Sequence, residues 1–63
     1  MDFAKNLRKA RKKLQISQAT LASRIGVRQS TIGMWETGAR EPKLSDLETI
    51  AVALKTTPEE LIK

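Results

Sequence analysis

The sequence predicts an all-α fold, and three observations support that class. Apolar residues recur three and four positions apart in successive stretches of the 63-residue chain, which is the spacing of one helix face. Residues typical of helix starts and ends separate those stretches. No stretch alternates apolar and polar residues as a half-buried strand does. Because a chain this short can form only one small core, we expect a single compact domain of five helices, residues 1–63.

The first stretch, from about Asp2 to Leu14, has the pattern of an amphipathic helix. Its apolar residues Phe3, Leu7, Ala10 and Leu14 are spaced so that they fall on one face. Asp2 is expected to cap the start of the helix. The opposite face carries Lys5, Arg8, Lys9, Lys12 and Lys13.

Residues 18–37 contain two short helical patterns separated by Gly26. Gly26 supplies the positive φ that ends a helix without steric cost. Ala22 in the first pattern is small enough to allow a close helix crossing, and Ile32 and Trp35 lie on the core side of the second pattern. Two short helices joined in this way form a helix-turn-helix, whose second helix is expected to enter the major groove of DNA.

A loop and two further helices are expected after this motif. Gly38 ends the second motif helix. Ser45 and Glu48 have the spacing of a capping box, which makes Ser45 the expected N-cap of a fourth helix. Pro58 is suited to the first position of a fifth helix.

The composition excludes several classes of function. The chain has neither cysteine nor histidine, so it cannot form a disulfide, a Cys or His metal site, or a nucleophile activated by histidine. We therefore expect no enzymatic activity, cofactor, metal or small-molecule substrate. The longest apolar run, Ile50 to Leu54, is far shorter than the roughly 20 residues that span a bilayer. The N-terminus also lacks the apolar stretch of a signal peptide, so a cytoplasmic location is expected.

The net charge of +5 is unevenly distributed along the chain. Up to Lys43 there are ten basic and three acidic residues, whereas residues 44–63 have two basic and four acidic residues. The N-terminal two-thirds is therefore the part expected to bind a polyanion.

The chain also resembles a known family at several positions together. The shared positions are Gln18, Ala22, Gly26, the run Ser30-Thr31-Ile32, and the set Trp35, Glu36, Gly38, Arg40 and Pro42. Over about Leu7 to Leu61 the chain resembles the phage repressor and Cro class of bacterial regulators, also called the XRE type. The resemblance implies a repressor-like five-helix domain that binds double-stranded DNA.

Five residues are candidates for contact with base edges: Arg28, Gln29, Ser30, Gly33 and Met34. Arg28 and Gln29 stand at the N-terminal tip of the second motif helix, the end that enters the groove first. Gln29 can donate to and accept from adenine, whereas Arg28 can contact either guanine or a phosphate. Ser30 can hydrogen-bond a base, Met34 can pack on a thymine methyl, and Gly33 can let the backbone approach the DNA closely. Arg28 stands where the family often has a small hydroxyl residue, so the helix start is expected to be less well capped.

Five other residues are candidates for the phosphate backbone: Gln18, Thr31, Thr37, Arg40 and Lys43. Gln18 begins the first motif helix, where the helix N-terminus adds partial positive charge, and the resemblance implies a phosphate contact there. Arg40 and Lys43 lie in the following loop, where they can meet the phosphate backbone or the edge of the minor groove. Such contacts position a domain without reading sequence.

An ion pair between Arg11 and Glu36 is expected to tie the first helix to the second motif helix. Each residue lies about 40° around its helix from an apolar core position, so each is expected to be half-buried. A half-buried guanidinium needs a carboxylate partner, and the resemblance implies the same pair. The alternative is a solvated pair at the rim that contributes under about 1 kcal/mol.

The sequence thus predicts a sequence-specific regulator of transcription, a repressor or an activator, that inserts the helix from about Gln29 to Glu36 into the major groove. A weak homodimer on an inverted-repeat operator is expected. Leu61, Ile62 and the neighbouring acidic surface are candidate dimer contacts, with a place in the core as the alternative for Leu61. The main alternative is an antitoxin-like or adaptor module that binds a protein and binds DNA secondarily. A third interpretation, a membrane-surface helix, is disfavoured because Phe3 and Leu7 are needed in the core.

Overall fold

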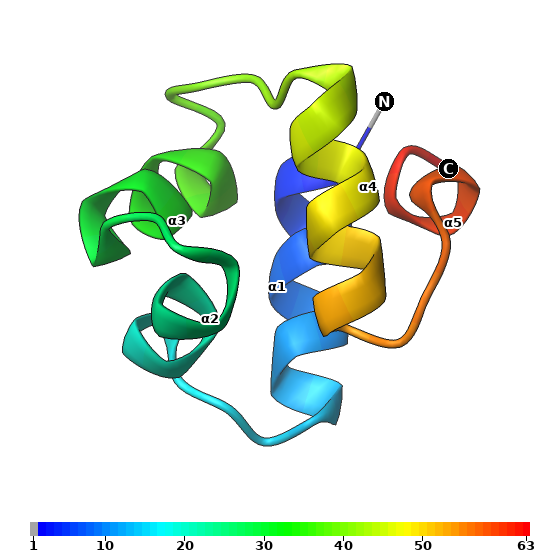
Figure 1. The fold of residues 1–63 in the computed structure, drawn as a ribbon. Helices are drawn as coiled ribbons and strands as arrows, with labels where there is room; N and C mark the ends of the chain where they lie inside the picture. Colours follow the sequence, from blue (N-terminus) through cyan, green and yellow to red (C-terminus); the bar gives the residue numbers. More distant parts are fainter. Residues whose placement is uncertain (1) are drawn as a thin grey trace.

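The computed structural model describes residues 2–63 and contains five helices connected by short loops (Figure 1). The helices are α1 (Phe3–Lys13), α2 (Gln18–Ile25), α3 (Gln29–Thr37), α4 (Leu44–Ala53) and α5 (Pro58–Leu61). In Figure 1, α1 occupies the centre, α2 and α3 lie together on one side, α5 lies on the other, and α4 crosses in front. The prediction of an all-α five-helix domain is confirmed.

Every helix contributes at least one large side chain to a single core. The largest fully buried side chains are Leu7 of α1, Leu21 of α2, Ile32 and Trp35 of α3, Ile50 of α4 and Leu61 of α5. Burying one such side chain contributes about 1.5–3 kcal/mol of transfer free energy. Leu61 is therefore a core residue, which decides between the two roles considered for it and excludes it as a dimer contact.

Three helix boundaries have clear capping or terminating residues, and those at Gly26 and Pro58 were predicted. The Ser17 hydroxyl accepts a hydrogen bond from the backbone N–H of Thr20 at 3.0 Å, which caps α2. The Thr57 hydroxyl accepts from the N–H of Glu60 at 3.2 Å, and Pro58 follows as the first helical residue of α5. At the C-terminal end of α2, Gly26 has a φ of 75°.

The start of α4 differs from the prediction. The helix begins at Leu44, one position before the expected cap, and Lys43 occupies the N-cap position. The carboxylate of Asp46 accepts a hydrogen bond from the backbone N–H of Lys43 at 2.8 Å. Since Ser45 is already inside the helix, the predicted capping box of Ser45 and Glu48 does not form. Lys43 also keeps its ammonium free of this capping interaction.

The first helix follows an N-cap at Asp2, as predicted, and ends at Lys13, one residue earlier than predicted. Asp2 occupies the N-cap position, but its side chain makes no capping hydrogen bond. Its carbonyl oxygen instead accepts from the N–H of Asn6 at 2.8 Å. After α1 and α4, Gln15 and Lys55 adopt left-handed backbone conformations with φ of 58° and 56°. Such a conformation is unfavourable for residues other than glycine by about 1–2 kcal/mol.

Candidate nucleic-acid interface

Helix α3 has one buried face and one exposed face. Ile32, Trp35 and Glu36 are buried, with at most 7% of each residue exposed. The exposed residues are Gln29, Ser30, Met34 and Thr37, whereas Thr31 and Gly33 are half-buried. Together with α2, this helix lies at the edge of the molecule on the side away from α5 (Figure 1). The polar face of α3 is thus free to meet a partner.

The N-terminal tip of α3 carries no side-chain cap. Arg28 is the N-cap residue with extended backbone angles, and its side chain makes no capping hydrogen bond. The expectation of a less well capped helix start at Arg28 is confirmed. Arg28 and Gln29 are both exposed, so the guanidinium and the amide lie at the end of the helix with their donors available.

The side chains of Arg11 and Glu36 form the ion pair that joins α1 to α3. Arg11 Nε donates to Glu36 Oε2 at 2.6 Å, and Arg11 Nη2 donates to Glu36 Oε1 at 2.9 Å. The Arg11 Nη1 atom donates to the backbone carbonyl of Ile16 at 2.9 Å. The side chains of Arg11 and Glu36 are only 11% and 4% exposed, which excludes the solvated rim pair. A bidentate geometry of this kind also fixes orientation.

Both charges are stabilised by this arrangement. Burial alone raises the pKa of the Glu36 carboxyl, but hydrogen bonds from Arg11 and Gln18 and the charges of Arg11 and Arg8 outweigh it. The pKa of Glu36 therefore lies below its ordinary value. The hydrogen bond to Glu36 raises the pKa of Arg11 against the opposing effect of burial.

The amide of Gln18 belongs to the same network. Gln18 Nε2 donates to Glu36 Oε1 at 3.1 Å, so a residue from α2 completes the link between α1 and α3. Sequence reasoning assigned Gln18 only to phosphate and missed this contact. Residue spacing alone gave no signal for this contact, because it depends on how closely α2 approaches α3.

Trp35 packs beneath α3 against Phe3 of α1. The two ring centroids are 6.3 Å apart, and the rings are nearly perpendicular at 82°. Within residues 2–63, Trp35 Nε1 is the buried side-chain polar atom without a hydrogen-bond partner. Since the ring is 2% exposed, Trp35 is a packing residue and offers no base-stacking surface.

The loop after α3 presents two cations. Arg40 and Lys43 are both exposed, and the N–H of Arg40 donates to the carbonyl of Met34 at 3.2 Å. The Thr37 hydroxyl donates to the same carbonyl at 3.2 Å and accepts from the N–H of Ala39 at 3.4 Å. Thr37 therefore shapes the turn around Gly38, whose φ is 82°, and its hydroxyl is partly committed.

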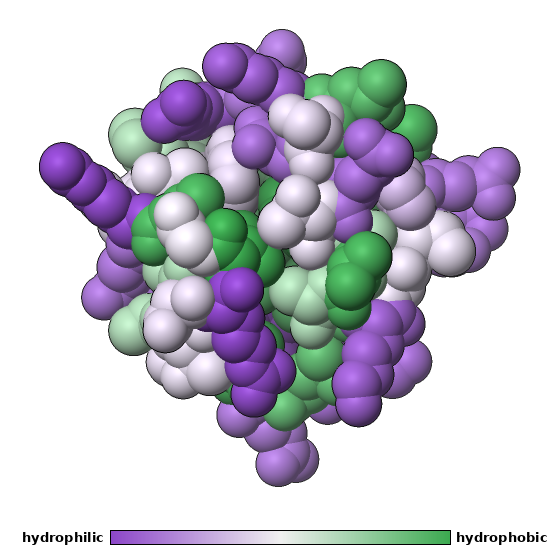
Figure 2. Space-filling view, viewed as in Figure 1, coloured by the Kyte–Doolittle hydropathy of each residue, from purple (hydrophilic) through white to green (hydrophobic). Residues whose placement is uncertain are grey.

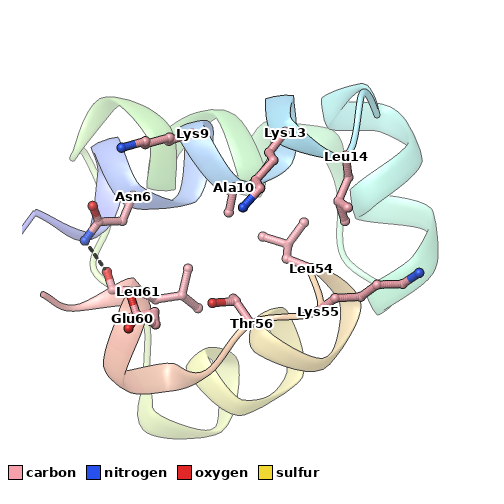
Figure 3. A pocket seen from close by; sticks show the side chains of 10 residues that line it. All are labelled: Asn6, Lys9, Ala10, Lys13, Leu14, Leu54, Lys55, Thr56, Glu60 and Leu61. Carbon is pink, nitrogen blue, oxygen red and sulfur yellow. Dashed lines mark hydrogen bonds between the residues drawn. The ribbon is translucent and has the colours of Figure 1, made fainter.

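The remaining surface carries separate apolar groups and a cavity away from α3. Figure 2 shows apolar patches among hydrophilic residues on the visible face, with no continuous apolar area. The large exposed apolar residues are Met34, Leu44, Val52 and Ile62. A cavity of about 300 Å³ lies between α1 and the end of α4 and α5, with Lys9, Lys13 and Lys55 around it (Figure 3). None of the residues of α3 lines this cavity.

Neither a cluster of metal-ligating side chains nor a membrane-spanning helix is found among the described residues. In residues 2–63 no group of three or more carboxylate, histidine or cysteine side chains is placed to hold an ion. None of the five helices is long and apolar enough to cross a membrane.

A model of the helix-turn-helix family matches residues 7–61. The chain belongs to the XRE-type helix-turn-helix family. It is 37% identical over 61 residues to repressor protein C2 of Salmonella phage P22, covering 97% of this chain and 28% of that protein. It is 48% identical over 44 residues to antitoxin HigA1 of Mycobacterium tuberculosis, covering 70% of this chain and 30% of that protein. This XRE-type chain thus spans less than a third of these two curated relatives.

Solved structures of XRE-type proteins superpose closely on this chain. The restriction-modification controller protein C.AhdI of Aeromonas hydrophila has a TM-score of 0.90 and 37% identity, covering 95% of this chain and 91% of that one. The P22 c2 repressor in complex with a synthetic operator also has a TM-score of 0.90, with 34% identity. The superposition covers 97% of this chain and 92% of that chain. The chain is therefore a DNA-binding domain of the XRE type, in a family of regulators rather than enzymes.

Proposed function

We propose that the chain is a sequence-specific transcriptional regulator that binds double-stranded DNA by placing α3 in the major groove, in the cytoplasm of a bacterium. The observation that carries the proposal is the division of α3 into a buried and an exposed face. The bidentate pair of Arg11 and Glu36 holds the buried face, so the exposed residues keep a fixed orientation. A rigid helix that presents polar groups is what direct readout of base edges requires.

In this proposal, base contacts come from the tip and the exposed face of α3. Gln29 pairs with an adenine through its amide, and Arg28 contacts a guanine or the adjacent phosphate. Ser30 contacts a neighbouring base edge. Gly33 and Met34 meet the groove further along the helix.

Phosphate contacts flank α3 on both sides. Arg40 and Lys43 hold one stretch of backbone, and Thr31 and Thr37 contribute their remaining hydrogen-bonding capacity. Gln18 donates one amide hydrogen to Glu36, so its phosphate contact relies on the second amide hydrogen and on the free N–H groups at the start of α2. These contacts fix the register of α3 in the groove.

We further propose that two copies act as a weak homodimer on an inverted repeat. The domain measures 24 × 23 × 19 Å between Cα positions, whereas half-sites on one face of DNA are about 34 Å apart. Neighbouring copies then meet only through surface side chains such as Ile62, which is 40% exposed. Such a small interface is weak without DNA. A regulator of this kind represses where its operator overlaps the promoter and activates where it contacts the polymerase, and the proposal includes both outcomes.

A selection from random duplex DNA at about 150 mM salt, where phosphate attraction is partly screened, tests the proposal. We expect enrichment of an inverted repeat, which would give the half-site spacing directly. Enrichment of an unrepeated half-site would support sequence-specific binding and contradict the proposed dimer. Binding that enriches no sequence and disappears as salt rises would overturn the proposal.

Similarity to antitoxin HigA1 favours one alternative function, a module that binds a partner protein and binds DNA secondarily. The two functions predict different results when the domain is used to capture partners from a cell extract. A stable protein complex recovered after nuclease treatment would favour the alternative, whereas recovery of the domain alone would favour the DNA regulator.

A further inference from the structure

The cavity between α1 and the ends of α4 and α5 has an apolar floor. Its volume is about 300 Å³, and no residue of α3 lines it. Leu54 and Leu61 in its lining are only 3% and 1% exposed, and Ala10 and Leu14 of α1 are half-buried. Sites that bind small molecules have volumes of about 300–1,000 Å³ and mostly apolar walls. The cavity is therefore large enough for a small organic molecule.

The exposed rim of the same cavity carries cations. Lys9 and Lys13 come from α1, Lys55 follows the end of α4, and all of them are exposed. Figure 3 shows the side chains of Lys13 and Thr56 pointing into the cavity from opposite walls. An ammonium group has three hydrogen-bond donors and no acceptor, and a hydroxyl adds one more donor. The polar part of the cavity is thus suited to an anion.

No carboxylate of the described residues neutralises these lysines. Glu60 is the acidic residue in the lining, and its carboxylate is paired with Lys63 at 3.3 Å. The other ion pair within residues 2–63 joins α1 to α3. The three lysines of the rim therefore have no carboxylate partner in residues 2–63, and an anion bound among them would reduce their mutual repulsion.

We infer that this cavity binds a small organic anion with an apolar body, of the class of short-chain carboxylates. The carboxylate of the ligand lies among the ammonium groups of Lys9, Lys13 and Lys55. Its hydrocarbon chain lies against Leu54 and Leu61. An inorganic anion lacks the part that the apolar floor holds, and a neutral apolar molecule lacks the charge. The inference goes beyond the proposed function and does not depend on it, since α3 does not line the cavity.

Three probes test the two parts of the site separately. Hexanoate has both parts, acetate has the charge alone, and 1-hexanol has the hydrocarbon chain alone. Each is titrated into the isotope-labelled 63-residue chain, and backbone amide shifts are followed by NMR. We expect hexanoate to bind with a Kd of about 1 mM and each of the others at least about tenfold more weakly. Each buried methylene increases affinity about fourfold, so burial of two that acetate lacks is sufficient.

The location of the shifts and two variants connect binding to the cavity. Amides of Ala10, Thr56 and Leu61 should shift on saturation with hexanoate, whereas those of α3 should not. K13Q is expected to weaken hexanoate binding about fivefold, because an ammonium of the rim is lost. K12Q is the matched control, since Lys12 is exposed on the same helix, removes the same charge and does not line the cavity. K12Q should bind hexanoate as the wild type does.

Three results would overturn the inference. The first is the absence of saturable shifts at the cavity in hexanoate up to about tenfold above the expected Kd. The second is equal affinity for acetate and hexanoate, which would indicate attraction to surface cations alone. The third is an equal loss of hexanoate affinity in K12Q and K13Q. None of these results bears on DNA binding, and failure of the random-DNA selection leaves this inference untouched.

Discussion

The guanidinium of Arg11 and the carboxylate of Glu36 are joined by two hydrogen bonds, at 2.6 and 2.9 Å, that connect α1 to α3. The carbonyl of Ile16 accepts a third hydrogen bond from Arg11, and Gln18 donates a further one to Glu36. The network therefore gathers α1, α2 and α3 around one buried carboxylate. Because α3 carries the exposed polar face, this network sets the direction in which that face points.

Replacing Glu36 by glutamine is expected to reduce the free energy of unfolding by about 3 kcal/mol, because it leaves the Arg11 charge buried without a counter-ion. For a domain of this size the melting temperature should fall by about 12 °C or more. Circular dichroism at pH 7 measures the change. E60Q is the matched control, since Glu60 pairs with Lys63 at 3.3 Å with both side chains more than half exposed. An unchanged midpoint for E36Q would contradict a structural role for the pair.

Stability is expected to fall in acid through the same carboxylate. The pKa of Glu36 is lower in the folded protein than its ordinary value of 4.5, so the stability contributed by ionisation is present above pH 4.5. It is lost as the pH falls from 4.5 through the folded-state pKa. Thermal melts between pH 7 and pH 2 should show this loss in the wild type and a smaller one in E36Q. Parallel curves for the two proteins would show that other carboxyl groups cause the acid sensitivity.

Replacing Arg28 by serine is expected to change stability and DNA binding in opposite directions. Serine can accept a hydrogen bond from an N–H of the first turn of α3, which Arg28 does not do, so the free energy of unfolding should rise by about 1 kcal/mol. DNA affinity should fall because a cation at the tip of the helix is lost. Thermal melts and duplex titrations on the same variant check both changes. If the variant is more stable and binds DNA as tightly as the wild type, Arg28 contacts neither a base nor a phosphate.

The left-handed residues give a paired stability prediction. K55G should stabilise the domain by about 0.5–1 kcal/mol, because glycine adopts the φ of 56° at Lys55 without steric cost. G26A should destabilise it by about 1 kcal/mol, although a Cβ at Gly26 would have free space. Chemical denaturation measures both. Loss of stability in K55G would indicate that the Lys55 side chain makes a larger contribution than its backbone conformation costs.

Base and phosphate contacts should respond differently to substitution. Q29A is expected to cost about 1–3 kcal/mol of binding and to relax preference at one base pair. K43A is expected to weaken all duplexes similarly and to reduce the salt dependence by about one unit. Titrations of specific and scrambled duplexes over a range of salt distinguish the two. If Q29A loses the same binding free energy on every sequence, Gln29 does not read a base.

Helix positions and core residues could be predicted from the sequence because they depend on local spacing. The i, i+4 and i+7 spacing of Phe3, Leu7 and Ala10 predicts a buried helix face from helix geometry alone. Gly26 predicts the end of α2, because glycine readily adopts the positive φ that ends a helix. The start of α4 was harder to predict. Ser45 and Glu48 have both side chains of a capping box, whereas at the observed start only the carboxylate of Asp46 caps, by accepting from the N–H of Lys43.

Tertiary contacts between polar groups were only partly accessible from the sequence. The angular positions of Arg11 and Glu36 indicated two half-buried opposite charges, which led to their pairing. The contacts of Gln18 with Glu36 and of Arg11 with Ile16 depend on distances between elements that periodicity does not contain. The commitment of the Thr37 hydroxyl to Met34 and Ala39 likewise follows from the turn geometry.

Trp35 makes the underside of α3 visible to optical spectroscopy. It is the one tryptophan of a chain without tyrosine, so the intrinsic fluorescence of the protein arises at a single point. Trp35 is 2% exposed, so the solvent has little access to its ring. Emission from the native protein should therefore lie at short wavelength. A shift to longer wavelength would report movement of α3 away from Phe3, without any label on the face that meets the partner.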